Sequence, residues 1–178
     1  RFNAMPWVNT IAASDDGRAV YLDNSNVGNL SKDTQERWRA SLKEDRLAAG
    51  LYADRGYILL DGSSTANDWV IAGDSPNPGT VPFDEKPFLE RKDYVFNSND
   101  SYWLGNPAQP LSGYSILYGS TDTARSVRSR MNIRMLDNAY QDAGDDGRFS
   151  IHELQSALFA NRGLTAELLL PALVESCR

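Results

Sequence analysis

The order of secondary-structure signals along the chain is the feature that most limits its fold. Strand and turn signals predominate in residues 1–120, and helical signals predominate in residues 121–178. Strands that alternate with helices are typical of parallel βαβ sheets, whereas strand and helix regions that are separated along the chain are typical of α+β folds. The sequence contains no internal repeat that would indicate a solenoid or a propeller. It therefore predicts an α+β protein.

The first part of the chain is predicted to form short strands joined by loops. β-rich runs predict strands at residues 4–11, 18–22, 57–60 and 93–97. Ser14-Asp15-Asp16-Gly17 lies between the first two runs, and an Asp-Gly turn in that place indicates a β-hairpin. Residues 72–87, which are rich in Pro and Gly, predict a long irregular loop.

Four helices are predicted, at residues 31–50, 121–139, 150–159 and 165–176. Ser31 is expected to cap the first helix and Gly50 to end it. Ser150 and Glu153 form the S-x-x-E pattern of a capping box at the start of the third. Pro171 is expected to interrupt or kink the last helix, because proline has no backbone N–H.

The charge and the counts of cysteine and histidine argue against several classes of protein. The 18 basic and 24 acidic residues give a net charge of −6, which argues against a general nucleic-acid binder. The single cysteine, Cys177, excludes an internal disulfide, and the single histidine, His152, leaves one candidate for a Ser-His-Asp triad. Its place in the predicted capping box makes His152 a surface residue rather than a catalytic base. No apolar run approaches the roughly 18 residues that a membrane span needs.

An acidic segment could bind calcium. The residues that fit positions 1, 5, 6, 9 and 12 of an EF-hand loop are Asp142, Asp146, Gly147, Ser150 and Glu153. Position 3 is Gly144, which has no side-chain oxygen, so the charge that would capture calcium is reduced. The alternative is an acidic turn before the capping box, in which Glu153 reaches back to the N-cap amide.

Two polar groups are candidates for a catalytic site. Arginines on the predicted 121–139 helix form two short rows, Arg125 with Arg128 and Arg130 with Arg134. Such rows usually form a solvated or salt-bridged face, and a functional role requires one arginine to turn inward. The segment at residues 97–101, Asn-Ser-Asn-Asp-Ser, is either an ordinary turn or a strand end that presents an amide donor to a developing oxyanion.

Several blocks of sequence, in order along almost the whole chain, resemble the penicillin acylase family. They are residues 5–13, 60–63 with Trp69, 93–104, 106–111, 123–126, 149–158 and 166–177. The Asn-x-Asn-Asp-Ser block with its Trp and Asn-Pro continuation is the most specific of them. The similarity is greatest to the branch of the acyl-homoserine-lactone acylases and aculeacin A acylase.

The resemblance implies an N-terminal-nucleophile hydrolase, whose precursor cleaves itself so that a Ser becomes the first residue of the β chain. The free α-amine of that Ser serves as the general base. It also implies that Asn99 and a backbone amide hold the oxyanion, and that Arg125 orients the site. The chain begins with Arg1 and contains no Gly-Ser junction before a matching β-chain start. We therefore expect a middle-to-C-terminal part of the β chain, without the nucleophile.

The family's fold is an αββα sandwich, and this chain is expected to supply part of it. Residues 1–178 would form one incomplete domain, rich in strands and loops over 1–120 and helical over 121–178. The expected partners are the rest of the β chain, the α chain and an acyl-amide substrate such as an N-acyl-homoserine lactone, an acylated lipopeptide or a β-lactam. We expect no cofactor, no activity in the isolated chain, and a periplasmic or secreted location. Because the sandwich is incomplete, an exposed sheet edge or an apolar patch is also expected.

Two other functions stay open at this point. One is a non-catalytic module that binds calcium or a partner through residues 142–153, and its stability would rise when calcium is added. The other is an aromatic ligand-binding module, since the four Trp and eight Tyr could line a preformed pocket.

Overall fold

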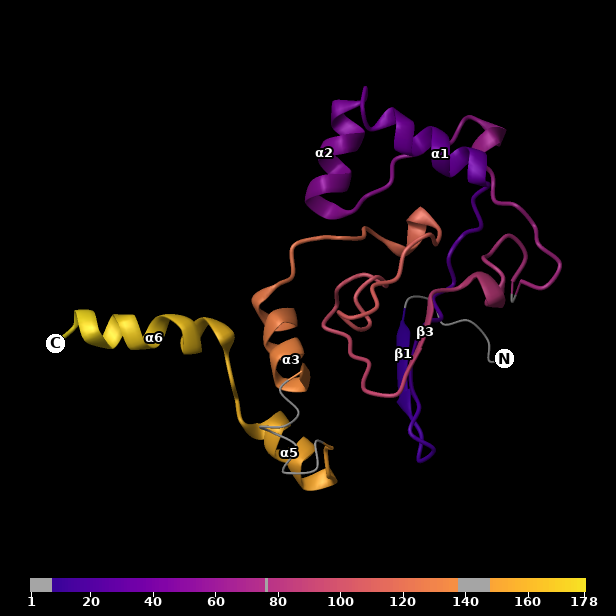
Figure 1. Ribbon diagram of the computed structural model, residues 1–178. Coiled ribbons are helices and arrows are strands. Elements are labelled where there is room, and N and C mark those ends of the chain that lie inside the picture. The colour runs from indigo at the N-terminus through magenta and orange to yellow at the C-terminus, as the bar shows by residue number, and fades with distance from the viewer. Residues whose placement is uncertain (1–7, 76, 138–147) are drawn as a thin grey trace. The chain divides into compact units, whose positions relative to one another are not determined.

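The computed structural model describes residues 8–75, 77–137 and 148–178 (Figure 1). The chain folds as two compact units. The first, which we call the sheet unit, is made of Arg1–Val95 and Ser101–Asp122. The second, the helical unit, is made of Phe96–Asp100 and Thr123–Arg178.

The sheet unit contains an antiparallel sheet of three strands in the order β1-β2-β3. These are β1 (Asn9–Ala13), β2 (Ala19–Asp23) and β3 (Phe88–Arg91). The predicted hairpin is confirmed: Ser14 N–H donates to the Arg18 carbonyl at 2.9 Å, and Gly17 adopts the positive φ of 80° that the turn requires. Residues 4–7 of the first predicted strand lie outside the described residues.

The other two predicted strands are wrong. Within the described part of the chain, residues 57–60 belong to no strand, and Ile58 and Leu60 instead pack against the buried cluster of Leu30, Trp38 and Ile116. Their apolar character therefore reflects packing beside a helix rather than sheet pairing. Residues 93–97 are not a strand either, since β3 ends at Arg91 and the Tyr94 carbonyl accepts its hydrogen bond from the side chain of Asn106 at 2.8 Å.

The predicted 31–50 helix is in fact two helices, α1 (Lys32–Ser41) and α2 (Arg46–Arg55). Ser31 caps α1 as expected, because its Oγ accepts from the Thr34 N–H at 3.1 Å. Asp45 starts a second helix, because its Oδ1 accepts from the Leu47 and Ala48 N–H groups of α2 at 2.9 and 3.0 Å. Gly50 lies inside α2, and Gly56, with φ of 69°, ends it instead.

A buried lysine connects the long loop to the end of β2. Lys86 is 2% exposed, and its Nζ donates to the carbonyl and side-chain oxygens of Asn24 at 3.3 and 3.1 Å and to the Ser25 carbonyl at 3.0 Å. Burial lowers the pKa of Lys86, and the nearby charge of Asp23 opposes that effect. The predicted loop at 72–87 is confirmed as irregular over its described residues, with one short turn of 3-10 helix at Phe83–Glu85.

The helical unit contains α3 (Val127–Asp137), α5 (Ile151–Phe159) and α6 (Leu164–Ser176). The predicted 121–139 helix begins six residues late, because the Ser126 Oγ accepts from the Ser129 N–H at 3.0 Å and caps α3 there. The capping box of α5 is confirmed, with both of its hydrogen bonds present. α6 continues through Pro171, so the predicted interruption there is wrong, and proline still lacks the N–H for a backbone hydrogen bond within the helix.

These elements confirm the α+β class, with an antiparallel sheet early in the chain and five helices among the described residues. Large apolar side chains are exposed on α5 and α6: Ile151, Leu154, Leu158, Phe159, Leu168, Leu169, Leu170, Leu173 and Val174. Within the described ranges, no single helix is long and apolar enough to cross a membrane. Only α5 and α6 together, bent by 53°, satisfy that test of length and composition.

Candidate functional site

Asn99 lies at the tip of the short segment Phe96–Asp100, which belongs to the helical unit. Its φ is 62°, a left-handed conformation that Asn tolerates better than most residues. The Asn99 N–H donates to the Asn97 Oδ1 at 3.0 Å, which closes a side-chain-mediated turn. Asn99 is exposed, so the segment is a turn and at the same time presents an amide group outward.

The residue before Asn99 is anchored to α3. Ser98 is only 4% exposed, and its carbonyl accepts from Arg128 Nη2 at 2.6 Å. The Ser98 Oγ accepts from Asn132 Nδ2, also at 2.6 Å. Arg128 and Asn132 are one helical turn apart, so both reach Ser98 from the same face of α3.

The residue after Asn99 is anchored to the same helix. The Ser129 Oγ donates to the Asp100 carboxylate at 2.5 Å, and it shares a second hydrogen bond with the Ser126 Oγ at 2.8 Å. Ser129 is fully buried and lies in the first turn of α3, where the helix dipole favours a negative charge such as that of Asp100. Asn99 is therefore held between two fixed neighbours.

Arg125, the other residue singled out from the sequence, precedes α3 instead of lying on it. It is exposed, two residues before the first residue of the helix, and belongs to the same unit as Asn99. Of the other arginines in the series, Arg128 makes the contact with Ser98, and Arg134 pairs with Glu167 at 3.2 Å. Arg128 is thus the arginine that reaches the segment carrying Asn99, and the residue as a whole is exposed.

The sequence reasoning missed Ser129 and Asn132. Ser129 belongs to a Ser-x-x-Ser pattern at the helix start, which is a capping signal that could have been read. Asn132 lies four residues after Arg128, and this spacing places two polar side chains on one face. Their acceptors lie about thirty residues earlier in the chain, and nothing local marks that pairing.

Of the calcium candidates, Asp142 and Asp146 lie outside the described residues. The Glu153 carboxylate accepts from the Ser150 N–H at 2.7 Å, which is the capping-box alternative. Among the residues that the structure describes, no group of three or more His, Cys, Asp or Glu side chains is arranged to hold a metal ion. His152 and Cys177 are both exposed.

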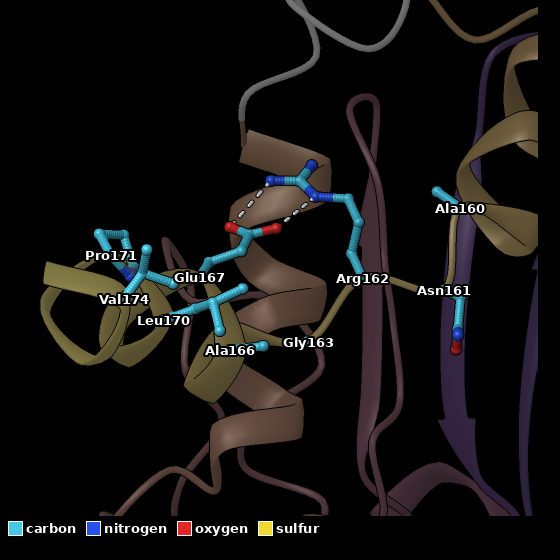
Figure 2. Close-up of a pocket in the computed structure, with 9 residues that line it drawn as sticks. All are labelled: Ala160, Asn161, Arg162, Gly163, Ala166, Glu167, Leu170, Pro171 and Val174. Atoms are coloured by element: carbon cyan, nitrogen blue, oxygen red, sulfur yellow. Dashed lines mark hydrogen bonds and ion pairs between the residues drawn. The ribbon is translucent and has the colours of Figure 1, made fainter. Parts of the chain in front are cut away.

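The turn between α5 and α6 forms an open pocket of about 560 Å³ (Figure 2). Arg162, which lines this pocket, donates two hydrogen bonds to the Glu167 carboxylate, at 2.7 and 3.2 Å. The hydrogen bond from Arg162, and then the charges of Arg162 and Arg134, lower the pKa of Glu167. Leu170 and Val174 of α6 supply an apolar wall. Since the negative charge of Glu167 is balanced by Arg162 and Arg134, the pocket is a part of the apolar α5–α6 surface rather than a charged binding site.

Comparison of the sequence with known protein families identifies the family of this chain. The model of the penicillin amidase family matches residues 1–178. The chain therefore belongs to the penicillin amidase family, as the resemblance predicted, and this family implies an N-terminal-nucleophile hydrolase.

The individual relatives are acylases. The acyl-homoserine lactone acylase PvdQ of Pseudomonas putida is 33% identical over 178 residues, which is 100% of this chain and 21% of the relative. The acylase of the same name from Pseudomonas fluorescens is 35% identical over 176 residues, with 97% of this chain and 20% of the relative covered. The aculeacin-A acylase of Actinoplanes utahensis is 36% identical over 185 residues, with 100% and 22% covered. The chain thus spans about a fifth of the length of these relatives.

Proposed function

We propose that this chain is part of an acylase that hydrolyses an acyl amide, and that Asn99 is its side-chain donor to the oxyanion. The observation that carries the proposal is that Asn99 is fixed by both of its neighbours and still exposes its amide. The names of the relatives favour an acyl-homoserine lactone or aculeacin A as the kind of substrate. Family membership supports a nucleophilic Ser in another part of the protein.

In the reaction, the Ser hydroxyl attacks the acyl carbonyl while the α-amine takes its proton. The negative charge that develops on the carbonyl oxygen is met by the Asn99 Nδ2–H and by a backbone N–H from outside this chain. The C–N bond then breaks, the amine leaves with a proton, and an acyl-enzyme remains. Water hydrolyses this ester to give the carboxylic acid and the free Ser. Arg125, beside the start of α3, orients the site through its positive charge.

The remaining polypeptide of the acylase is the proposed partner of the apolar α5–α6 surface. Exposed apolar side chains cover α6, with Leu169 and Leu173 about 60% exposed, which is unusual for a finished surface. About four-fifths of the length of the relatives lies beyond the region matched by this chain, so ample polypeptide exists to cover that surface. In the complete protein the chain would form part of an αββα sandwich, with a periplasmic or secreted location.

The oxyanion assignment is tested in the full-length enzyme with Asn99→Asp. This change keeps the size and the left-handed preference of the side chain but replaces its donor with a charged acceptor. We expect kcat to fall by about 10²–10³-fold, while self-cleavage of the precursor, followed by gel and mass spectrometry, continues. The matched control is Asn161→Asp, because Asn161 is also exposed and also left-handed, with φ of 50°. Near-normal turnover of the Asn99 variant would contradict the assignment.

A further inference from the structure

We propose that Arg128, Ser129 and Asn132 of α3 are positioning residues for Asn99. Together with their acceptors, Ser98 and Asp100, they form what we call the α3 clamp. The proposal rests on the proposed role of Asn99 as oxyanion donor and adds the residues that set its geometry.

The three bonds of the clamp end on the two residues that flank Asn99. Two of them, from Arg128 and Asn132, hold Ser98 at 2.6 Å, and the third, from Ser129, holds Asp100 at 2.5 Å. All three donors belong to the first two turns of one helix, so the spacing between the two anchors is fixed by a rigid element. Because both neighbours of Asn99 are bonded to the same helix, the rotation of the Asn99 backbone is restricted.

The presence of Asn rather than Gly at position 99 indicates that the clamp positions the Asn99 side chain. Glycine adopts a left-handed φ without steric cost and is the usual residue where only a tight turn is needed. Here the chain carries Asn99 at a φ of 62° and holds it there with three side-chain hydrogen bonds. Strained residues that are fixed by their surroundings in this way are typical of functional sites.

The burial of one donor and one acceptor strengthens this conclusion. The donor Ser129 is 0% exposed and the acceptor Ser98 is 4% exposed, so water does not readily replace the bonds that these two residues make. The Ser129 N–H is also used to cap α3 through Ser126. A shift of α3 at its start would therefore be transmitted directly to Asp100 and to the direction of the Asn99 amide.

The experiment uses the full-length enzyme and compares Ser129→Ala with Asp100→Asn and Asp100→Ala. Ser129→Ala and Asp100→Ala both remove the anchor, and we expect kcat to fall about ten- to a hundredfold, with KM nearly unchanged because the oxyanion forms only in the transition state. Asp100→Asn keeps an oxygen that accepts from Ser129, so it should retain most of kcat. Ser156→Ala, an exposed serine of α5, is the control for the substitution itself.

A double variant separates positioning from general stability. If Ser129 acts through Asn99, then adding Ser129→Ala to Asn99→Gly lowers kcat by less than about twofold, because the donor is already gone. The clamp proposal is overturned if Ser129→Ala lowers kcat equally in both backgrounds, or if Ser129→Ala alone has normal turnover. In either case the kcat of Asn99→Gly still tests the role of Asn99 as donor. Normal turnover of Asn99→Gly overturns the donor assignment, and with it any role for the clamp in catalysis.

Discussion

Replacing the buried Lys86 by methionine should loosen the joint between the long loop and the end of β2. Methionine is similar in length but has no ammonium group, so Lys86→Met leaves three acceptors without their donor: the carbonyls of Asn24 and Ser25 and the Asn24 Oδ1. Each buried acceptor that loses its partner costs about 1–3 kcal/mol.

An opposing effect reduces that cost. Burial disfavours the charged form of Lys86 and so lowers its pKa, and this penalty disappears in the variant. Three oxygens lose their donor, whereas only one buried charge is removed. We therefore expect the free energy of local opening to fall by about 3 kcal/mol, which is within the range measured when one partner of a buried charged interaction is removed.

Hydrogen exchange in the whole acylase measures this loss. The Asp23 N–H donates to the Pro87 carbonyl at 2.9 Å and the Ser25 N–H donates to Asp23 Oδ1 at 3.1 Å, so both amides report on the joint. A loss of about 3 kcal/mol corresponds to exchange that is about a hundredfold faster. Lys92→Met, at an exposed lysine just after β3, should leave the rates unchanged. A change of less than about threefold at Asp23 and Ser25 would refute the expected balance.

Two further predictions concern acid stability and the α6 surface. The hydrogen bonds from Arg91 lower the pKa of Asp93 from 3.8 to about 2, so the stability that Asp93 contributes is complete above pH 3.8 and is lost as the pH falls toward 2. The difference in melting temperature between the wild type and Asp93→Asn should therefore shrink over that window, and a constant difference down to pH 2 would contradict it. In α6, Leu173→Glu should lower the yield of soluble, self-cleaved enzyme, because the rest of the acylase would have to bury the new charge, whereas Lys43→Glu, at an exposed position outside the α5–α6 surface, should not. Equal yields of the two variants would argue against the proposal that the rest of the acylase covers the α5–α6 surface. The same holds if the wild-type enzyme is bound to membranes and Leu173→Glu releases it.

The features that the sequence predicted correctly depend on short-range chemistry. The Asp-Gly hairpin, the Ser31 cap and the Ser150–Glu153 capping box each involve residues within a few positions of one another. The break between α1 and α2 is equally local, but the predicted single helix overlooks the Asp45 cap and ends at Gly50, which lies inside α2. That error reflects a glycine that the packed helix tolerates.

The features that could not be predicted depend on contacts between distant segments. Ile58 and Leu60 look like a strand by composition, and only their packing beside Trp38 shows why they need no strand partner. The family resemblance singled out Asn99 through its sequence block, but the support from Arg128, Ser129 and Asn132 arises across about thirty residues. Residue types alone carry no signal for such a pairing, because Arg, Ser and Asn on a helix are usually solvated.

The helical unit is not one continuous stretch of the chain, and this matters for anyone who wishes to cut or transplant it. Five residues, Phe96–Asp100, are contributed by the middle of the chain, while both of their flanks belong to the sheet unit. An excised piece that starts at Thr123 would carry α3 but leave behind Ser98 and Asp100, so a buried serine would lose its acceptor. A transplant of the helical unit must therefore include Phe96–Asp100 together with the segment that begins at Thr123.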